Sequence, residues 1–349
     1  MSDKPKFFNH TLPELTQAIK AHGKEGFRAQ QLYRWVHAEG VQDFDQMTNL
    51  SKDFRREVPE MFDFALPKVL KIHKSIDGTT KFLFEMGQGK SVEAVLIPST
   101  DRLTLCVSSE VGCNMACKFC FTAKQKLQRK LETWEIVGQF VQVTRTLPPG
   151  EFIRNIVFMG MGEPLDNPEA VFKSIDILHS NWGLNVSRKR ITVSTSGIVP
   201  MIPRVTEAGV RLAVSLNGVN DEVRSQIMPI NKRWPLKDLL QACREHCAQS
   251  GDKVTFEYVL LAGVTDSLAD AKALYQLTKS IPCKINIIPF NEHPDSGYHR
   301  PPEANIVAFQ NELIRLGAHV LRRKTMGRDI YAACGQLTTA AKNLQLGVQ

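Results

Sequence analysis

From about residue 100 onward, short apolar segments alternate with longer amphipathic segments. The short segments are rich in β-branched and aromatic residues, as strands are, and they lie at 104–108, 155–159, 190–194, 212–216, 255–260, 284–289 and 319–322. Amphipathic stretches with helical spacing, such as 134–146 and 236–249, fall between them. Repeated strand–helix units favour a parallel sheet, and this many units favour a full or partial (β/α) barrel. In such barrels the chemistry takes place on the loops that follow the strands.

The residues before this alternation follow other patterns. Apolar residues between 11 and 64 have helical spacing, whereas those between 69 and 98 indicate strands joined by an Asp77-Gly78 hairpin turn. We therefore expect an α/β protein in three parts. A small helical accessory domain spans 1–65, a β-strand extension spans 66–100, and the barrel domain spans 101–349.

The charge and the cysteine content of the chain indicate its class of partner and its cellular compartment. There are 44 Lys and Arg against 36 Asp and Glu, a net charge of +8. This excess favours a polyanionic partner such as nucleic acid, and a solvated basic surface is the alternative. Neither a secretory signal nor a membrane-spanning apolar run is recognisable, so we expect a cytoplasmic protein without membrane contact. Eight cysteines in a reducing compartment suggest metal ligation or redox chemistry rather than a disulfide framework.

Three of the cysteines form the strongest local motif. They occur in Cys113-Asn-Met-Ala-Cys117-Lys-Phe-Cys120, directly after the first expected barrel strand. Thiolates at this spacing suit an iron–sulfur cluster or zinc, and the alternative is that the cysteines are buried free thiols that bind no metal. Structural zinc takes four protein ligands. A [4Fe–4S] cluster held by three cysteines instead leaves one iron open to a further ligand, as a catalytic cluster requires.

This spacing, with aromatic Phe119 before the last cysteine, resembles the signature of the radical S-adenosylmethionine superfamily. The segment Gly160-Met-Gly162-Glu163-Pro164 is similar to the superfamily's motif that binds the methionine amino group of the cofactor. Glycines allow the backbone to approach a ligand, and Glu163 offers an anion to an ammonium group. A simple glycine-rich turn is the alternative.

Most of the chain, from about 27 to 337, resembles a narrower family, the dual-specificity adenosine C2 methyltransferases of 23S ribosomal RNA and transfer RNA. The matching segments are 27–31 (FRAQQ), 106–113 (CVSSEVGC), 159–165 (MGMGEPL), 194–197 (STSG), 228–231 (MPIN) and 333–337 (ACGQL). The resemblance implies methylation of an adenosine in the peptidyl-transferase centre and of the adenosine 3′ of the anticodon, position 37, in transfer RNAs. Two S-adenosylmethionine molecules are consumed for each methyl group transferred.

The resemblance also implies a role for each matched residue. Cys334 is methylated by the first S-adenosylmethionine, and a radical formed on that methyl group adds to adenine C2. Glu93 then accepts the C2 proton, and Cys106 resolves the adduct through a transient disulfide with Cys334. The implied cluster ligands are Cys113, Cys117 and Cys120, and the implied cofactor contacts are Gly162, Glu163, Ser194, Ser215, Leu216, Asn217 and Asn291. The family usually has His where this chain has Asn217, so a contact that needs imidazole would be lost there.

The implied partners are 23S ribosomal RNA, transfer RNA and a flavodoxin-like or other low-potential electron donor, and we expect a monomer. Basic clusters at 124–130, 188–190 and 322–324 would contact phosphates, with solvated faces as the alternative. Two other functions are compatible with parts of the pattern. An adenine C8 methyltransferase shares the same cysteines, although Pro164 and Ser196 are more similar to the C2 group. A non-catalytic iron–sulfur RNA-binding protein would leave Cys106 and Cys334 without a role.

Overall fold

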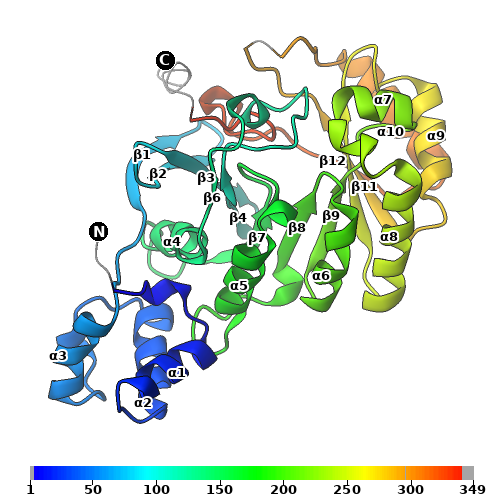
Figure 1. Cartoon of the computed structure of the whole chain (residues 1–349). Helices are drawn as coiled ribbons and strands as arrows, with labels where there is room; N and C mark the ends of the chain where they lie inside the picture. Colours follow the sequence, from blue (N-terminus) through cyan, green and yellow to red (C-terminus); the bar gives the residue numbers. More distant parts are fainter. Residues whose placement is uncertain (1–3, 295, 340–349) are drawn as a thin grey trace.

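The computed structural model describes residues 4–294 and 296–339, and within them one mixed sheet runs through most of the molecule (Figure 1). Its ten strands lie in the order β1-β2-β3-β4-β7-β8-β9-β10-β11-β12. Seven of them form the parallel part that the sequence predicts: β4 (Arg102–Cys106), β7 (Ile153–Phe158), β8 (Ile191–Thr195), β9 (Arg211–Ser215), β10 (Val254–Leu260), β11 (Cys283–Pro289) and β12 (Val320–Arg322).

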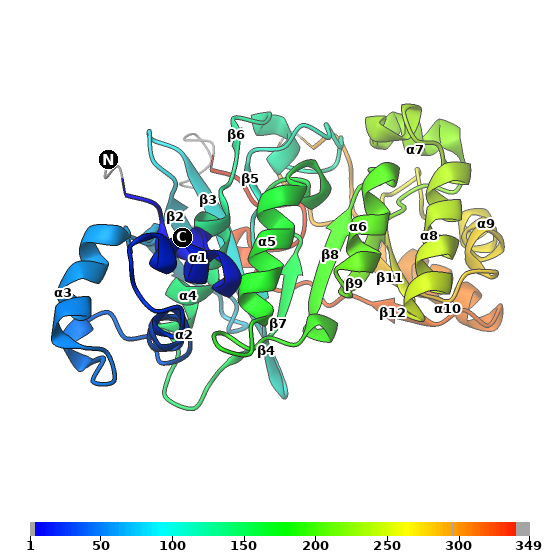
Figure 2. The same ribbon diagram turned by 60° about the horizontal axis from the view of Figure 1, so that its bottom comes forward.

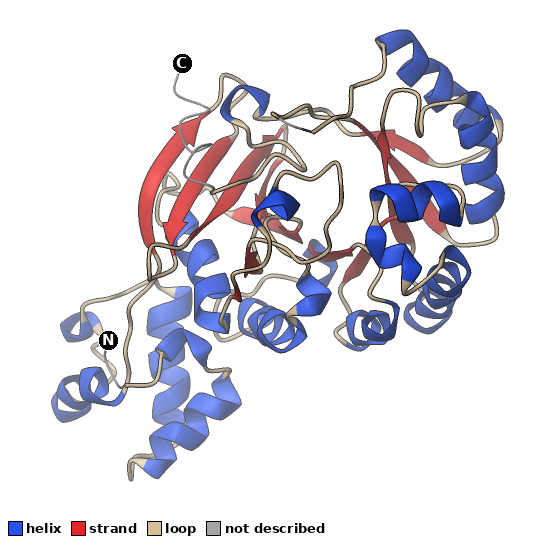
Figure 3. Ribbon diagram, turned by 45° about the horizontal axis from the view of Figure 1, so that its top comes forward, coloured by secondary structure: helices blue, strands red, loops and turns tan. Residues whose placement is uncertain are grey.

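Helices cover the convex face of this sheet, as Figure 3 shows. They are α4 (Thr133–Thr144), α5 (Pro168–His179), α6 (Ile202–Glu207), α8 (Leu236–Ser250), α9 (Leu268–Thr278) and α10 (Glu303–Arg315), with the short α7 (Asp221–Ile227) above α8. Among the described residues β12 pairs only with β11, so the strands do not close into a ring. The predicted partial (β/α) barrel is confirmed.

The β-strand extension continues the barrel sheet rather than forming a separate one. Its strands β1 (Lys68–Lys74), β2 (Thr80–Glu85) and β3 (Ser91–Ser99) pair antiparallel in sequence order. Strand β3 then pairs antiparallel with β4, which is itself parallel to β7. The sheet therefore changes from antiparallel to parallel at β4, the strand that ends at Cys106.

The N-terminal helices form their own hydrophobic cluster. Helices α1 (Leu12–Ala21), α2 (Phe27–Tyr33) and α3 (Lys52–Met61) are joined by short turns, including a π-helical turn over Arg34–Ala38. Their buried side chains include Phe7, Leu32 and Phe54, and they pack against Val137 and Val141 of α4. This cluster attaches the accessory helices to α4 of the barrel domain (Figure 1).

A two-residue strand pair frames the cysteine motif. Strand β5 (Glu110–Val111) pairs antiparallel with β6 (Arg129–Lys130), so the chain between them returns as one loop. We call residues 112–128 the cysteine loop. Gly112 at its base has φ +80°, and a Cβ atom there would lie 1.8 Å from the carbonyl oxygen of Lys126. Only glycine therefore allows the loop to close at this point.

No helix within residues 4–294 and 296–339 is long and apolar enough to cross a lipid bilayer.

Helix α4 contacts the start of the extension so closely that we expect alanine to be unfavourable at Gly138. A Cβ atom there would lie 2.3 Å from Cδ of Pro67. Alanine gains about 1 kcal/mol in helix propensity over glycine, but overpacking costs about 1–3 kcal/mol. Gly138→Ala should therefore lower the free energy of unfolding in urea. The double variant with Pro67→Ala removes the opposing ring atoms and should recover the loss, and additive effects would contradict this packing argument.

Candidate active site

One cavity at the carboxyl ends of the parallel strands collects most of the predicted site residues. Its lining includes Cys113, Cys117, Cys120, Gly162, Glu163, Ser194, Ser215, Asn217, Asn291 and Cys334. Three predicted residues do not line it. Leu216 is fully buried beside the cavity, Cys106 is buried at the end of β4, and Glu93 is buried on β3.

The three motif cysteines lie on the cysteine loop, which backbone hydrogen bonds fix on two sides. The amide of Lys118 donates to the carbonyl of Ile227 (2.9 Å), at the end of α7. The amide of Phe121 donates to the carbonyl of Gly335 (2.8 Å), in the segment that carries Cys334. The loop is thereby attached both to the barrel wall and to the C-terminal segment, so all four thiols face one space.

Three cysteine thiolates are the protein ligands that a [4Fe–4S] cluster with one open iron takes. Among the described residues, no three His, Cys, Asp or Glu side chains are grouped to hold one metal ion. In a [4Fe–4S] cluster each thiolate binds a different iron, so the sulfurs stand further apart than around a single ion. Burial raises the pKa of the Cys113, Cys117 and Cys120 thiols. Without metal these cysteines would therefore stay protonated, and binding to iron would displace the protons.

Glu163 is held in place by backbone amides. It is buried, and its two carboxylate oxygens accept hydrogen bonds from Ser196 N (2.7 Å) and Leu165 N (3.2 Å). Burial raises the pKa of Glu163, while the hydrogen bond from Ser196 lowers it. The preceding Gly162 has φ +98°, and a Cβ there would lie 2.6 Å from Cβ of Glu110. The motif thus holds a buried carboxylate in a fixed orientation in the cavity wall.

Asn217 combines a structural role with a place in the cavity wall. Its φ is +54°, a conformation that Asn tolerates better than most residues. Its side-chain oxygen accepts from Val259 N (2.9 Å), and its amide nitrogen lies 3.3 Å from the sulfur of Met228. Since that sulfur is a weak acceptor, the amide keeps donor capacity toward the cavity.

Arg224 is the main site residue that the sequence analysis missed. It is fully buried and lies behind the strand ends that carry Ser194, Ser215 and Asn217. Its guanidinium donates to the carbonyls of Leu216 (2.8 Å) and Ser196 (2.6 Å). No local pattern marks it, because a single Arg on an exposed-looking helix is ordinary. The only nearby signal was the 228–231 motif, whose Asn231 accepts from Arg224 (2.8 Å).

Glu93 lies between two donors. Its Oε1 pairs with the Lys81 ammonium at 2.9 Å, and its Oε2 accepts from Thr338 N at 3.0 Å. Lys81 also reaches the carbonyl of Tyr331 (3.3 Å). Burial raises the pKa of Glu93, and the charge of Lys81 opposes that rise. The acid and its cation lie on neighbouring strands, which places an ion pair inside the sheet extension.

Cys106 and Cys334 share a cation. Burial raises the pKa of the Cys106 thiol to about 12, and the positive charge of Arg323 opposes that shift. Arg323 likewise lowers the pKa of the Cys334 thiol against the effect of burial. The guanidinium is held by Glu257 (3.2 Å). Arg323 therefore has an acid partner and two nearby cysteines, neighbours that its position in the basic cluster 322–324 did not reveal.

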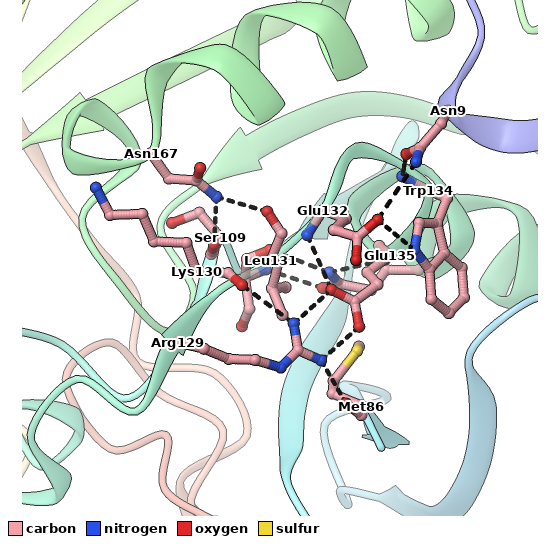
Figure 4. A network of polar contacts seen from close by, with 12 residues as sticks. Asn9, Met86, Ser109, Arg129, Lys130, Leu131, Glu132, Trp134, Glu135 and Asn167 are labelled. Carbon is pink, nitrogen blue, oxygen red and sulfur yellow. Dashed lines mark hydrogen bonds and ion pairs between the residues drawn. The ribbon is translucent and has the colours of Figure 1, made fainter. Parts of the chain in front are cut away.

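Other members of the predicted basic clusters are also engaged. Figure 4 shows Arg129 in an ion pair with Glu135 (2.6 Å), next to a hydrogen bond from Trp134 N to Asn9 Oδ1 (2.8 Å). Lys130 pairs with Asp166 (3.4 Å). Further pairs are Arg188–Asp176, Lys189–Asp252 and Arg322–Glu303. Phosphate contact by the three clusters stays a prediction, and Lys126, Arg190 and Lys324 are exposed cations within them for which no ion pair is described.

Comparison with known proteins identifies the family. Residues 107–275 match the model of the Radical SAM superfamily, and residues 6–63 match the model of the ribosomal RNA large subunit methyltransferase N-terminal domain. The dual-specificity RNA methyltransferase RlmN of Bdellovibrio bacteriovorus is 66% identical over 97% of this chain and 85% of its own length. That of Syntrophus aciditrophicus is 44% identical over 95% of both chains.

A solved structure agrees with the sequence relatives. The radical SAM methyltransferase from Sphaerobacter thermophilus superposes with a TM-score of 0.91 at 40% identity, covering 95% of this chain and 99% of that one. The three motif cysteines, Glu163 and Cys334 line one cavity, as the sequence motifs of the family led us to expect. From these relatives, the chain belongs to the dual-specificity RNA methyltransferases RlmN of the radical SAM superfamily, which use a [4Fe–4S] cluster and S-adenosylmethionine.

Proposed function

We propose that the protein methylates C2 of adenosine in 23S ribosomal RNA, at the peptidyl-transferase centre, and in transfer RNAs, at position 37. The observation that carries this proposal is the position of Cys334. It lines the same cavity as the three motif cysteines, although more than two hundred residues separate them. The amide of Asn291 donates to the carbonyl of Cys334 (3.2 Å), and this contact orients the segment.

The cavity lining divides into a cluster side and a cofactor side. A [4Fe–4S] cluster bound by Cys113, Cys117 and Cys120 would supply the electron that cleaves S-adenosylmethionine to a 5′-deoxyadenosyl radical. Gly162 and Glu163 would bind the methionine amino group, and Ser194, Ser215, Asn217 and Asn291 would contact the rest of the cofactor. Leu216 would act as a support, because its amide already donates to Glu257 O (2.9 Å).

Cys334 would carry the methyl group that ends on the base. Loss of hydrogen from that methyl leaves a carbon radical that adds to adenine C2 and tethers the RNA to the protein. Glu93 would then take the C2 proton while the adduct gives up its unpaired electron, for which a cluster held by Cys113, Cys117 and Cys120 would be the acceptor. The thiolate of Cys106 would next attack the sulfur of Cys334. The new disulfide frees the base carbon, which takes up a proton to become the methyl group.

The electrostatics around these groups support the proposed roles. Burial alone would keep Cys106 a thiol at neutral pH, and a thiol is a poor nucleophile. Arg323 opposes this effect and lies near both sulfurs, so it favours the thiolate that each step requires. Glu93 accepts a hydrogen bond from Thr338, four residues after Cys334. The proposed proton acceptor therefore contacts the segment that carries the methyl group, so both groups could reach the same adenine.

The three parts of the chain would divide the work. We propose that the helices of 1–65 bind folded RNA, that the extension 66–100 positions Glu93, and that the barrel 101–349 performs the chemistry. The protein would act as a cytoplasmic monomer and would receive electrons from a flavodoxin-like or other low-potential donor.

Nucleoside analysis tests the proposed product. The reconstituted enzyme should be incubated anaerobically with ribosomal and transfer RNA, and the digested nucleosides separated by mass spectrometry. We expect 2-methyladenosine. The appearance of 8-methyladenosine would instead assign the sister activity, and RNA binding without S-adenosylmethionine consumption would indicate a non-catalytic iron–sulfur protein.

The two cysteines outside the cluster should fail in different ways. Cys334→Ala removes the methyl carrier, so neither methylated RNA nor an adduct should form. Cys106→Ala keeps methyl transfer to Cys334 and radical addition, and it should accumulate a protein–RNA crosslink that ribonuclease collapses on a denaturing gel. Cys243→Ala, a buried cysteine outside the cavity, is the matched control. Normal turnover by Cys106→Ala would exclude the resolving role.

Lys81 should set the pH at which Glu93 works. In Lys81→Met the ammonium no longer opposes burial, so the pKa of Glu93 rises and the carboxylate form is reached only at higher pH. Release of crosslinked RNA should then shift to higher pH and fall by about tenfold or more at neutral pH, because one pKa unit is a factor of ten in the ionised fraction. Methylation of Cys334, read by mass spectrometry, should be unchanged.

Lys81→Arg is the control, since it keeps the charge beside Glu93. It should retain a profile close to that of the unmodified enzyme. If Lys81→Met and Lys81→Arg gave the same pH profile for adduct release, the ion pair would have only a structural role.

A further inference from the structure

A second hollow lies next to the cysteine loop, outside the active-site cavity. It runs between Asn114–Ala116 on the loop, the residues that follow β8, and the segment Pro229–Trp234 after α7. We call it the loop groove. Figure 2 shows β5, β6 and α7 along the same edge of the molecule, with α6 beneath them. The groove is therefore on the outer surface beside the proposed cluster ligands.

One residue separates the two hollows. Met115, between Cys113 and Cys117, lines both the loop groove and the active-site cavity, and no other described residue lines both. Its neighbours Asn114 and Ala116 are exposed. A partner seated in the groove would thus touch the chain that carries the thiolates without entering the space for S-adenosylmethionine and the base.

The groove combines an apolar floor with a basic rim. Met115, Met201 and Trp234 contribute apolar surface. On the rim, Lys232 and Arg233 are exposed, and neither side chain forms an ion pair within residues 4–294 and 296–339. Arg233 lies over the ring of Trp234 at 4.5 Å. The groove's other charged residues, Lys130 and Asp166, pair with each other, so the rim keeps a net positive charge.

We propose that the loop groove docks an acidic, low-potential one-electron carrier protein. This inference rests on the proposed function, because it requires a cluster on Cys113, Cys117 and Cys120. One electron leaves the carrier, which is oxidised by one electron, and enters the bound cluster, which is reduced by one electron; no atom is transferred. Met, Trp and Arg are enriched at protein interfaces, and electron-transfer contacts are small and transient.

RNA is also an anion, but the groove suits it less well. Its floor is largely aliphatic, formed by methionine, isoleucine and proline side chains, whereas phosphate tracks need many cations. The target base must moreover reach Cys334, which lines the other hollow. A carrier protein in the groove and RNA at the cavity therefore need not compete for the same residues.

Charge reversal on the rim separates these possibilities. The variant Lys232→Glu/Arg233→Glu should be studied as the cluster-loaded enzyme with flavodoxin as the probe. We expect its affinity for flavodoxin, measured by calorimetry at low ionic strength, to fall about tenfold or more, because electrostatic steering is lost. Methylation driven by reduced flavodoxin should fall in parallel. S-adenosylmethionine cleavage driven by dithionite, a small reductant that needs no docking, should be unchanged, as should RNA affinity.

The matched control reverses two exposed cations at the opposite ends of the strands, Arg211→Glu/Lys253→Glu. It makes the same change in net charge and should bind flavodoxin normally. Equal flavodoxin affinity in both variants would overturn the proposal, and so would a loss of RNA affinity in the groove variant alone.

If dithionite-driven cleavage also fell, the milder Lys232→Gln/Arg233→Gln variant should be measured, and absence of the flavodoxin-specific loss there would overturn the proposal. Failure of the proposed function would give a different experimental result. The unmodified enzyme would then form no 2-methyladenosine even with dithionite, whatever its affinity for flavodoxin.

Discussion

The buried guanidinium of Arg224 joins the loops on which the cofactor contacts depend. It donates to the carbonyls of Ser196, Leu216 and Ser215, at the ends of β8 and β9, and to the side chain of Asn231. Burial lowers its pKa to about 10, so it stays charged near neutral pH. Its four hydrogen bonds all go to backbone carbonyls or a side-chain amide oxygen, and leaving a buried charge without a partner costs about 3–5 kcal/mol. The cation thus fixes two strand ends relative to each other before any cofactor binds.

The second constraint is the return of the C-terminal segment across the extension and the cysteine loop. Residues 327–339 contact the extension and the cysteine loop, which lie about 214 to 254 positions earlier in the sequence, through specific polar contacts. The contacts are Gly327 N to Asp77, Ser75 to Asp329, Lys81 to Tyr331 O, Phe121 N to Gly335 O, Thr122 to Leu337 O and Thr338 N to Glu93. The extension is therefore more than a cover for the sheet edge. It is the surface against which the segment carrying Cys334 is aligned with the cluster site.

Sequence reasoning reached the parts of this design that depend on local pattern. The short apolar segments rich in β-branched and aromatic residues predicted the parallel strands to within a few positions, because strands buried on both faces appear in a sequence as nearly continuous apolar runs. The position of the cysteine motif directly after the first strand of the alternating pattern predicted that it lies on a loop, and the three cysteines do lie between β5 and β6. Pairing between distant residues could not be predicted in this way. For Arg129, Arg188 and Arg322 the sequence shows a cation but not the acid that the fold places beside it.

The same limit applies to Glu93, whose behaviour depends on two opposing effects. Burial disfavours its anion and makes it a stronger base, whereas Lys81 and the amide of Thr338 stabilise the anion and make it weaker. Burial is the larger effect, so the pKa of Glu93 is raised although the charge of Lys81 opposes the rise. A carboxylate has about four acceptor positions, and the two donors present use only two of them. Glu93 therefore holds the C-terminal segment without using all its acceptor positions, and the proton transfer proposed for it would use the same side chain that aligns the segment.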